Sequence, residues 1–204
     1  MYPIFFRNAI HPSLHRADKP VIISSNEEDG REKRAIDVAA LALQPFTVYG
    51  SAGALLVCGE GPALANPMTI SWGTFGIIWG RPIAMVLVRP TRHTFTFINR
   101  MPDFTINWLP DDWGDALKLC GSQSGRDLNK FTATGLTPTA SCAVTSPSIA
   151  ESVLTLECRT VYRDEIDPTL FMDPAIEGMY PSKDYHTLFF GEVVAAFGGE
   201  PFCG

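Results

Sequence analysis

Residues 154–163 read Leu-Thr-Leu-Glu-Cys-Arg-Thr-Val-Tyr-Arg, and this stretch decides the fold class. Leu, Leu, Cys, Thr and Tyr alternate with Thr, Glu, Arg, Val and Arg, which is the period of a β-strand with one face buried and the other in solvent. Residues 188–197 (LFFGEVVAAF) form a second long strand-like stretch. The chain shows little sustained helical periodicity, so we predict a mainly β protein.

Shorter strand-like stretches separated by turn residues precede these two, at residues 54–58, 69–72, 83–88 and 104–109. Many short strands with turn signals between them are typical of an antiparallel barrel or sandwich. Two helices are expected beside the strands. Asp111 and Asp112 can cap a helix that ends before Gly121, and a shorter helix can run from Ser124 to Gly135. The Pro-containing residues 137–148 are interpreted as a connection.

The domain organisation follows from the charge pattern near the N-terminus. Residues 26–34 (NEEDGREKR) crowd both signs of charge around one glycine, as in a solvated linker. We therefore expect residues 1–35 to be an N-terminal extension or tail, and residues 36–204 to form one domain.

Composition excludes several classes of protein. The chain has 16 Lys and Arg against 22 Asp and Glu, a formal charge of −6, which argues against nucleic-acid binding. No apolar run reaches the roughly 18 residues of a membrane span. Only 19% of residues are charged, below the usual share of about 25%, so we expect a partner subunit or ligand to cover part of the surface. Five cysteines without a C-x-x-C pair favour a reduced, cytoplasmic setting and no metal site.

Residues 66–73 (NPMTISWG) combine an amide, two hydroxyls and a tryptophan. Such a set suits a flat polar heterocycle, because polar groups can bond its edge while the indole lies against its face. An ordinary strand edge with one buried tryptophan is the alternative.

Two further stretches favour a phosphate. Residues 88–94 (VRPTRHT) place two arginines and two threonines at the end of an apolar strand, and residues 120–131 (CGSQSGRDLNKF) place Arg126 and Lys130 one helical turn apart. The second stretch lacks the spacing of a Walker A loop. A solvated strand end and a helix cap with a solvated basic face are the respective alternatives.

His186 follows Tyr180-Pro-Ser-Lys-Asp-Tyr at a junction between a loop and a strand. A polar side chain at such a junction can face a cleft, and the alternative is an exposed loop histidine.

Five motifs in this order, NPMTISWG, VRPTRHTF, CGSQSGRDLNKF followed by GLTP, LECRTVY and DYHTLFFGEVV, resemble a known family. They are similar to the flavin reductase-like proteins of the FMN-binding split-barrel class, particularly the flavoredoxin-like branch, over residues 45–194. The resemblance implies a six-stranded antiparallel Greek-key split barrel with peripheral helices, a homodimer, and FMN bound near the subunit interface.

The resemblance also implies roles for individual residues. Asn66 and Trp72 approach the isoalloxazine, with backbone contacts from Met68, Thr69 and Ser71. Thr94, with Arg92 or Arg89, contacts the ribityl phosphate. The phosphate-side loop contributes Ser124, Gly125, Arg126 and Lys130. His186 lies close to the flavin ring and is the candidate catalytic residue, either stabilising negative charge on reduced flavin or steering its proton balance.

Two functions compete at this point. The first is an NADH- or NADPH-dependent flavin reductase that transfers a hydride to FMN and passes electrons on. The second is an electron carrier that holds FMN tightly and is reduced by a redox partner protein. A weaker third hypothesis is a protein that only binds a related cofactor.

Overall fold

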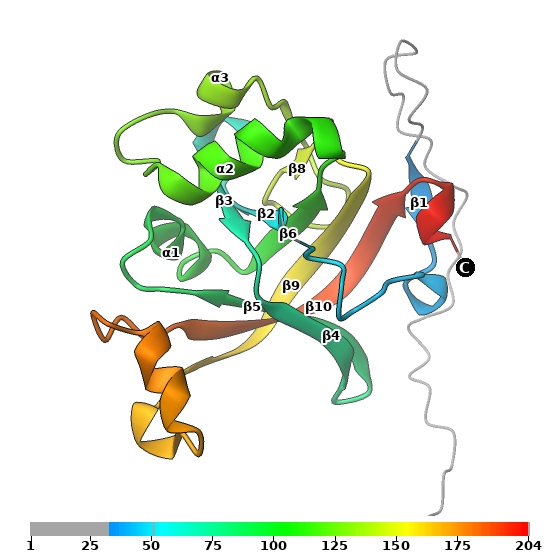
Figure 1. The fold of residues 1–204 in the computed structure, drawn as a ribbon. Coiled ribbons are helices and arrows are strands. Elements are labelled where there is room, and N and C mark those ends of the chain that lie inside the picture. The colour runs from blue at the N-terminus through cyan, green and yellow to red at the C-terminus, as the bar shows by residue number, and fades with distance from the viewer. Residues whose placement is uncertain (1–32, 51, 204) are drawn as a thin grey trace, which may run out of the picture.

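The computed structural model describes residues 33–50 and 52–203, and Figure 1 shows their arrangement. Most of the expected N-terminal extension, including residues 26–32 of the predicted linker, lies outside the described residues. Lys33 and Arg34 are described and do not behave as a solvated linker. Arg34 begins a strand, and the Lys33 ammonium donates to the Ile149 carbonyl oxygen at 2.9 Å.

One antiparallel sheet of eight strands dominates the described part of the chain. Its strand order is β3-β2-β6-β9-β10-β5-β4, and β1 pairs with the far half of β10. The bounds are Arg34–Ile36 (β1), Ala54–Gly59 (β2), Ala65–Ile70 (β3), Gly73–Ile78 (β4), Arg81–Val88 (β5), Asp103–Trp108 (β6), Leu154–Glu165 (β9) and Thr187–Gly198 (β10). Each of the six stretches expected from the sequence overlaps a strand, although residues 69–72 contribute only their first two residues to β3, and β1 and β4 were not predicted.

Strand β4 escaped prediction because its turn is unusual. It forms a tight hairpin with β5 through Trp79 and Gly80, whose φ angles are 54° and 69°. Two positive φ angles define the turn that fits the twist of a hairpin, but Asn-Gly or Asp-Gly is its usual signature. A tryptophan in the first position hides that signal.

Strand β9 departs from the predicted alternation in its first half, where Leu154 to Cys158 are all buried. The face expected in solvent is covered by the loop that follows β7 (Pro138–Thr139) and precedes β8 (Ser148–Ile149). The Glu157 carboxylate holds this loop by accepting from the backbone N–H groups of Cys142 and Ala143 at 2.9 and 2.6 Å. Residues 137–148, interpreted as a connection, therefore contain two short paired strands.

Three α-helices lie beside the barrel: α1 (His93–Ile98), α2 (Gly114–Ser122) and α3 (Lys130–Thr134). Helix α1 was not predicted. Helix α2 runs through Gly121 and is capped at Gln123, so the predicted end at Gly121 is wrong. Six 3-10 helices complete the described residues, at Val38–Ala40, Pro62–Leu64, Asp111–Trp113, Pro168–Leu170, Pro174–Met179 and Glu200–Phe202. In the described ranges no helix is long and apolar enough to cross a membrane.

Helix α3 is shorter than predicted. The Ser124 hydroxyl accepts from the Arg126 backbone N–H at 3.2 Å, so the chain turns there instead of starting a helix. The helix begins only where the Asn129 side chain accepts from the Thr132 N–H at 3.1 Å. It ends, as predicted, at Gly135, whose φ is 76°.

Strand β2 explains how the helices are held in place, because it is buried on both faces. Leu56 and Cys58 point into the barrel core, while Leu55 and Val57 belong to a second apolar cluster. That second cluster contains residues of α2 and α3: Ala116, Leu117, Cys120 and Phe131. The connection between α2 and α3 is thereby fixed next to β3.

Candidate functional site

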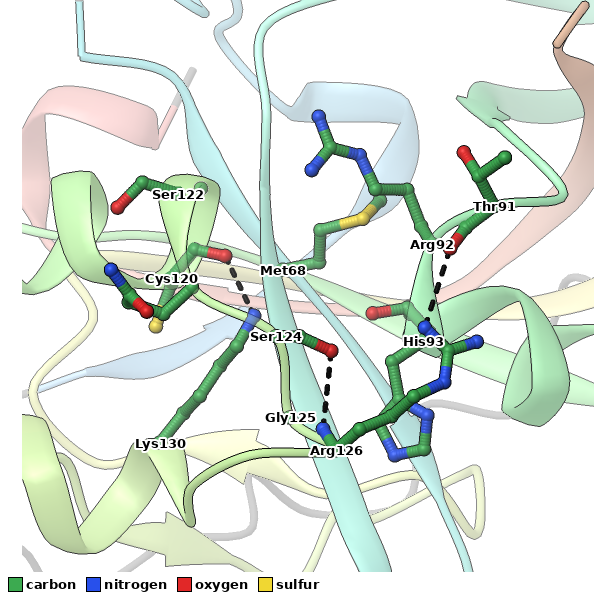
Figure 2. A pocket seen from close by; sticks show the side chains of 13 residues that line it. Met68, Thr91, Arg92, His93, Cys120, Ser122, Ser124, Gly125, Arg126 and Lys130 are labelled. Atoms are coloured by element: carbon green, nitrogen blue, oxygen red, sulfur yellow. Dashed lines mark hydrogen bonds between the residues drawn. The ribbon is translucent and has the colours of Figure 1, made fainter.

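A cavity of about 110 Å³ lies where β3, the start of α1 and the connection between α2 and α3 meet (Figure 2). Three segments that are distant in the sequence build its wall. We call it the cationic cavity, and its lining residues are Met68, Thr91, Arg92, His93, Thr94, Cys120, Gly121, Ser122, Gln123, Ser124, Gly125, Arg126 and Lys130.

Asn66 joins β3 to α1 at the edge of this cavity. Its side chain is buried and donates from Nδ2 to the Thr94 hydroxyl oxygen at 2.7 Å. The same Nδ2 also reaches the Pro67 carbonyl oxygen at 3.3 Å. Asn66 thus fixes Thr94, which lines the cavity together with the residues that precede it.

Gly125 permits the close approach of the α2–α3 connection to this pair. A Cβ atom at Gly125 would lie 1.9 Å from the Asn66 Oδ1 and 2.9 Å from the His93 Cδ2. Both distances are shorter than van der Waals contact, so any side chain here would force the two segments apart.

The charge of the cavity comes from Arg92, Arg126 and Lys130, and none of its described lining residues is acidic. Figure 2 shows Lys130 extending toward Cys120 and Arg126 reaching toward Thr91. Arg126 makes one long bond, from Nη1 to the Thr91 carbonyl oxygen at 3.4 Å. The described lining residues therefore carry positive charge and no carboxylate, although Asp127, next to Arg126, is close enough to oppose the lowering of the His93 pKa.

Lys130 is the buried member of the three. Its Nζ donates to the carbonyl oxygens of Cys120 and Pro67 at 2.7 and 3.1 Å, which leaves one of three N–H groups for a ligand. Burial is the main cause that lowers the pKa of this ammonium. Lys130 therefore ties α2 to β3 in addition to contributing charge.

Two other lining groups are uncharged. Burial, followed by the positive charges of Arg126 and Lys130, lowers the pKa of His93. Burial raises the pKa of the Cys120 thiol to about 11. Neither group offers a reactive anion or an additional cation at neutral pH.

A second group of residues lies beside the cavity and includes three predicted site residues, Trp72, Arg89 and His186. Together with Tyr180 and Asp184 they form what we call the histidine cluster. The His186 ring lies 5.3 Å from the Trp72 ring, between centroids, and its Nδ1 is 2.9 Å from the Tyr180 Oη. The Arg89 guanidinium donates to Asp184 at 2.6 Å and lies 4.8 Å above the Tyr180 ring.

Burial, with a contribution from neighbouring charges, sets the protonation state of His186. Burial, the Arg89 charge and the Arg92 charge together lower the pKa of His186 to about 4, although Asp184 opposes them. The imidazole is therefore neutral at pH 7. Thr91 connects the two groups, since its hydroxyl donates to Asp184 at 3.1 Å while its carbonyl accepts from Arg126.

The predicted site residues separate into three sets. Arg89, Trp72 and His186 belong to the histidine cluster, so Arg89 does not line the cavity as one predicted phosphate contact would. Thr69 donates its hydroxyl to the Leu117 carbonyl oxygen at 2.6 Å, and Ser71 is exposed; neither lines the cavity. The residues that the structure brings to the cavity wall are Met68, Arg92, Thr94, Ser124, Gly125, Arg126 and Lys130, with Asn66 behind Thr94.

Several residues of both groups were not among the predicted site residues. Thr91, His93 and Gly121 lie inside the quoted phosphate motifs, but no pattern distinguished them from their neighbours. Tyr180 and Asp184 lie in the stretch before His186, and their contacts depend on a turn in which Lys183 has a φ of 54°. The sequence motifs therefore identified the segments that form the two groups, but they did not identify which side chains in those segments contact one another.

Comparison with known proteins agrees with this architecture. The family model described as "Flavin reductase like domain" matches residues 44–201, most of the chain. The chain belongs to the flavin reductase-like family. Its mainly antiparallel sheet with few helices is the predicted split-barrel fold, which is confirmed. None of the curated proteins compared matches the chain.

Three solved structures have folds similar to that of this chain. Flavoredoxin from Methanosarcina acetivorans has 24% identity and a TM-score of 0.56, with 72% of this chain and 68% of that chain covered. An FMN-binding domain of a flavin reductases-like enzyme from Shewanella baltica OS155 has 21% identity, a TM-score of 0.57, and 82% and 77% coverage. The NADH:FAD oxidoreductase SgcE6 from Streptomyces globisporus C-1027 has 20% identity, a TM-score of 0.53, and 70% and 72% coverage.

Proposed function

We propose that this protein is an FMN-binding oxidoreductase whose cationic cavity takes the phosphate of the flavin. The observation that carries the proposal is three cations on a cavity wall that has no acidic lining residue among those described. Arginine pairs with phosphate through its forked donors, and such charge-assisted bonds are strong. The name of the Shewanella baltica neighbour, an FMN-binding domain, supports the same cofactor.

The cavity is large enough to hold one chemical group of a ligand but not a whole cofactor molecule. At about 110 Å³ it is smaller than the roughly 300–1,000 Å³ of a typical small-molecule site. A phosphate fits, and the rest of the ligand must lie outside. Thr91 connects the cavity to the histidine cluster, so we place the flavin ring on the side of Trp72 and His186, as the sequence motifs predict.

Bound flavin would supply the hydride and electron chemistry, and the chain would bind and orient it. Arg92 and Arg126 balance the phosphate charge. Asn66 holds Thr94, and Gly125 lets the two segments close on the phosphate. Trp72 is 40% exposed, so its indole is accessible to a ligand ring that would stack on it.

Affinity for flavins of different charge tests the cofactor. Arg126→Gln should weaken FMN binding about 10- to 100-fold, since a hydrogen bond to a charged group contributes about 1.5–3 kcal/mol. Riboflavin, which lacks the phosphate, should bind the variant and the parent alike. Arg81→Gln is the matched control, because Arg81 pairs with Glu192 on β10 away from the cavity. Equal losses for FMN and riboflavin would contradict the proposal.

The electron donor is tested separately. We propose an NADH- or NADPH-dependent reductase, which the name of the Streptomyces globisporus neighbour supports. Bleaching of the bound flavin by either nicotinamide without oxygen is the expected result. Inertness to both would favour the second candidate, an electron carrier reduced by a redox partner protein, which the flavoredoxin neighbour supports.

We also propose that two copies of the chain associate. Large apolar side chains are exposed at the β4–β5 hairpin and in the segment between β9 and β10: Ile77, Trp79, Leu170, Met172 and Met179. Figure 1 shows the latter segment, in orange, standing away from the barrel. Exposed apolar patches commonly mark protein–protein interaction sites. Light scattering at several concentrations should give the mass of a dimer, and a monomer mass throughout would contradict this.

A further inference from the structure

Tyr180 and His186 are in direct contact, and the phenol lies at one of the two imidazole nitrogens. Tyr180 is 4% exposed, and its Oη lies 2.9 Å from the His186 Nδ1. The two rings meet edge to face, with centroids 5.5 Å apart and an angle of 77° between their planes. The phenol and the ring nitrogen are therefore held in place by packing as well as by the hydrogen bond.

Either atom could donate in principle, but the surroundings favour the phenol. Burial raises the pKa of Tyr180, so the hydroxyl is protonated at neutral pH. If Nδ1 carried the proton instead, the phenol hydrogen would need another acceptor, and the described residues provide none for it. A buried donor without an acceptor is costly, whereas an unused lone pair costs less.

The neighbouring charges act in the same direction. His186 is faced by Arg89 from the end of β5, by Arg92 at the start of α1, and by Asp184 from its own loop. Arg89 is bound to Asp184 at 2.6 Å, so the carboxylate is already paired. Trp72, which contacts the ring from the end of β3, is uncharged. No unpaired anion in the described residues near the ring would stabilise a second proton.

We propose that Tyr180 is a positioning residue that holds His186 as a neutral imidazole with its proton on Nε2. Nε2 is not a buried atom, and no described group bonds to it. It is thus a fixed hydrogen-bond donor for an acceptor atom on a ligand. This assignment rests on the proposed function: the acceptor is a carbonyl oxygen or ring nitrogen of the flavin. His186 then stabilises developing negative charge by donation and does not deliver a proton.

Nitrogen NMR of the full chain tests the tautomer without any cofactor. In protein with ¹⁵N-labelled histidine, long-range proton–nitrogen spectra at pH 6–8 should show His186 protonated at Nε2 alone. Tyr180→Phe keeps the ring packing and removes the hydroxyl, so we expect both tautomers to appear and the pKa of His186 to rise. Protonation at Nδ1 in the parent, or an unchanged spectrum in Tyr180→Phe, would overturn the proposal.

Tyr185→Phe is the matched control. Tyr185 contacts the Tyr180 ring at 5.0 Å, but its hydroxyl donates to Glu177 and not to the histidine. Its loss should leave the His186 tautomer unchanged. A tautomer change in this control equal to that in Tyr180→Phe would also overturn the proposal.

Adding FMN separates the two proposals. On FMN binding, the His186 Nε2 proton should shift in the parent and in Tyr185→Phe, and Tyr180→Phe should bind FMN about 3- to 10-fold more weakly, the effect of one hydrogen bond. Failure of FMN to bind any variant would refute the proposed cofactor but leave the ligand-free tautomer result intact. FMN binding without any change at Nε2 would overturn the assignment of His186 as its donor.

Discussion

The cationic cavity and the histidine cluster lie side by side, but their cations differ in whether a carboxylate pairs with them. The cavity exposes cations without carboxylates among its described lining residues. The histidine cluster pairs its one cation with Asp184 and keeps its imidazole neutral. A region with unbalanced charge is suited to bind an anion, and a charge-balanced region is suited to orient a ligand without attracting other ions.

The two regions also differ in what holds them together. The cavity depends on backbone approach, because Gly125 lies against Asn66 and Lys130 bonds two carbonyl oxygens. The histidine cluster depends on contacts between side chains, with Tyr180 in contact with both Arg89 and His186. Substitutions that act through packing should therefore affect mainly one region, although Thr91 and the charge of Arg92 connect the two.

The largest effect is expected from Gly125→Ala. Its Cβ would overlap the Asn66 Oδ1, and overpacking typically costs about 1–3 kcal/mol. FMN affinity, measured by fluorescence quenching, should fall about 10- to 100-fold. Gly178→Ala is the control, since nothing lies within 4 Å of a Cβ atom there. The NMR signals of His186 should not move in either variant, and a change in Gly125→Ala would show that the two regions are not independent.

Lys130→Met should lower stability by about 1–2 kcal/mol, because the carbonyl oxygens of Pro67 and Cys120 lose their donor. The penalty of burying the ammonium is removed at the same time, which limits the loss. Urea unfolding measures the change, and Lys118→Met on the exposed face of α2 should be near neutral. Unchanged stability in Lys130→Met would mean that the lysine serves the ligand alone.

A further effect concerns pH and belongs to the histidine cluster. The pKa of His186 falls from 6.5 to about 4 on folding, so the unfolded chain binds the additional proton between these values. Stability should therefore decrease as pH falls from about 6.5 to about 4. This dependence should be weaker in His186→Gln than in the parent when urea midpoints are compared across that range. An identical pH profile in both proteins would contradict the neutral histidine.

The smallest effect is expected from Asp184→Asn, which frees Arg89 from its ion pair. The pKa of His186 should fall further, because Asp184 raises it. FMN affinity should change by less than about fivefold, the usual limit of about 1 kcal/mol for such a pair. Titration calorimetry with FMN measures this change in affinity. A tenfold gain would place Arg89 at the phosphate, as the sequence motif predicted.

The predictions from sequence succeeded where a local pattern carries the information. Strand-like composition identified six strands, and Gly135 marked the end of α3 because its left-handed conformation favours glycine. Prediction failed where a local bond competes with a helix or where distant contacts decide. Ser124 was expected to begin a helix, but its hydroxyl accepts from the Arg126 N–H two positions later and a turn forms instead. Strand β1 has three residues and exists only because β10 offers an edge to Arg34 and its neighbours.

The sequence alone determined the fold family and predicted the segments that line the cavity, because strand patterns and ordered motifs are properties of neighbouring residues. Only the tertiary structure decided which side chains meet. It separated Arg89 from Arg92, three positions apart, by pairing Arg89 with Asp184 and leaving Arg92 on the cavity wall. It also brought Tyr180 to His186. Charge pairing and proton position depend on distances through space, which linear spacing does not specify.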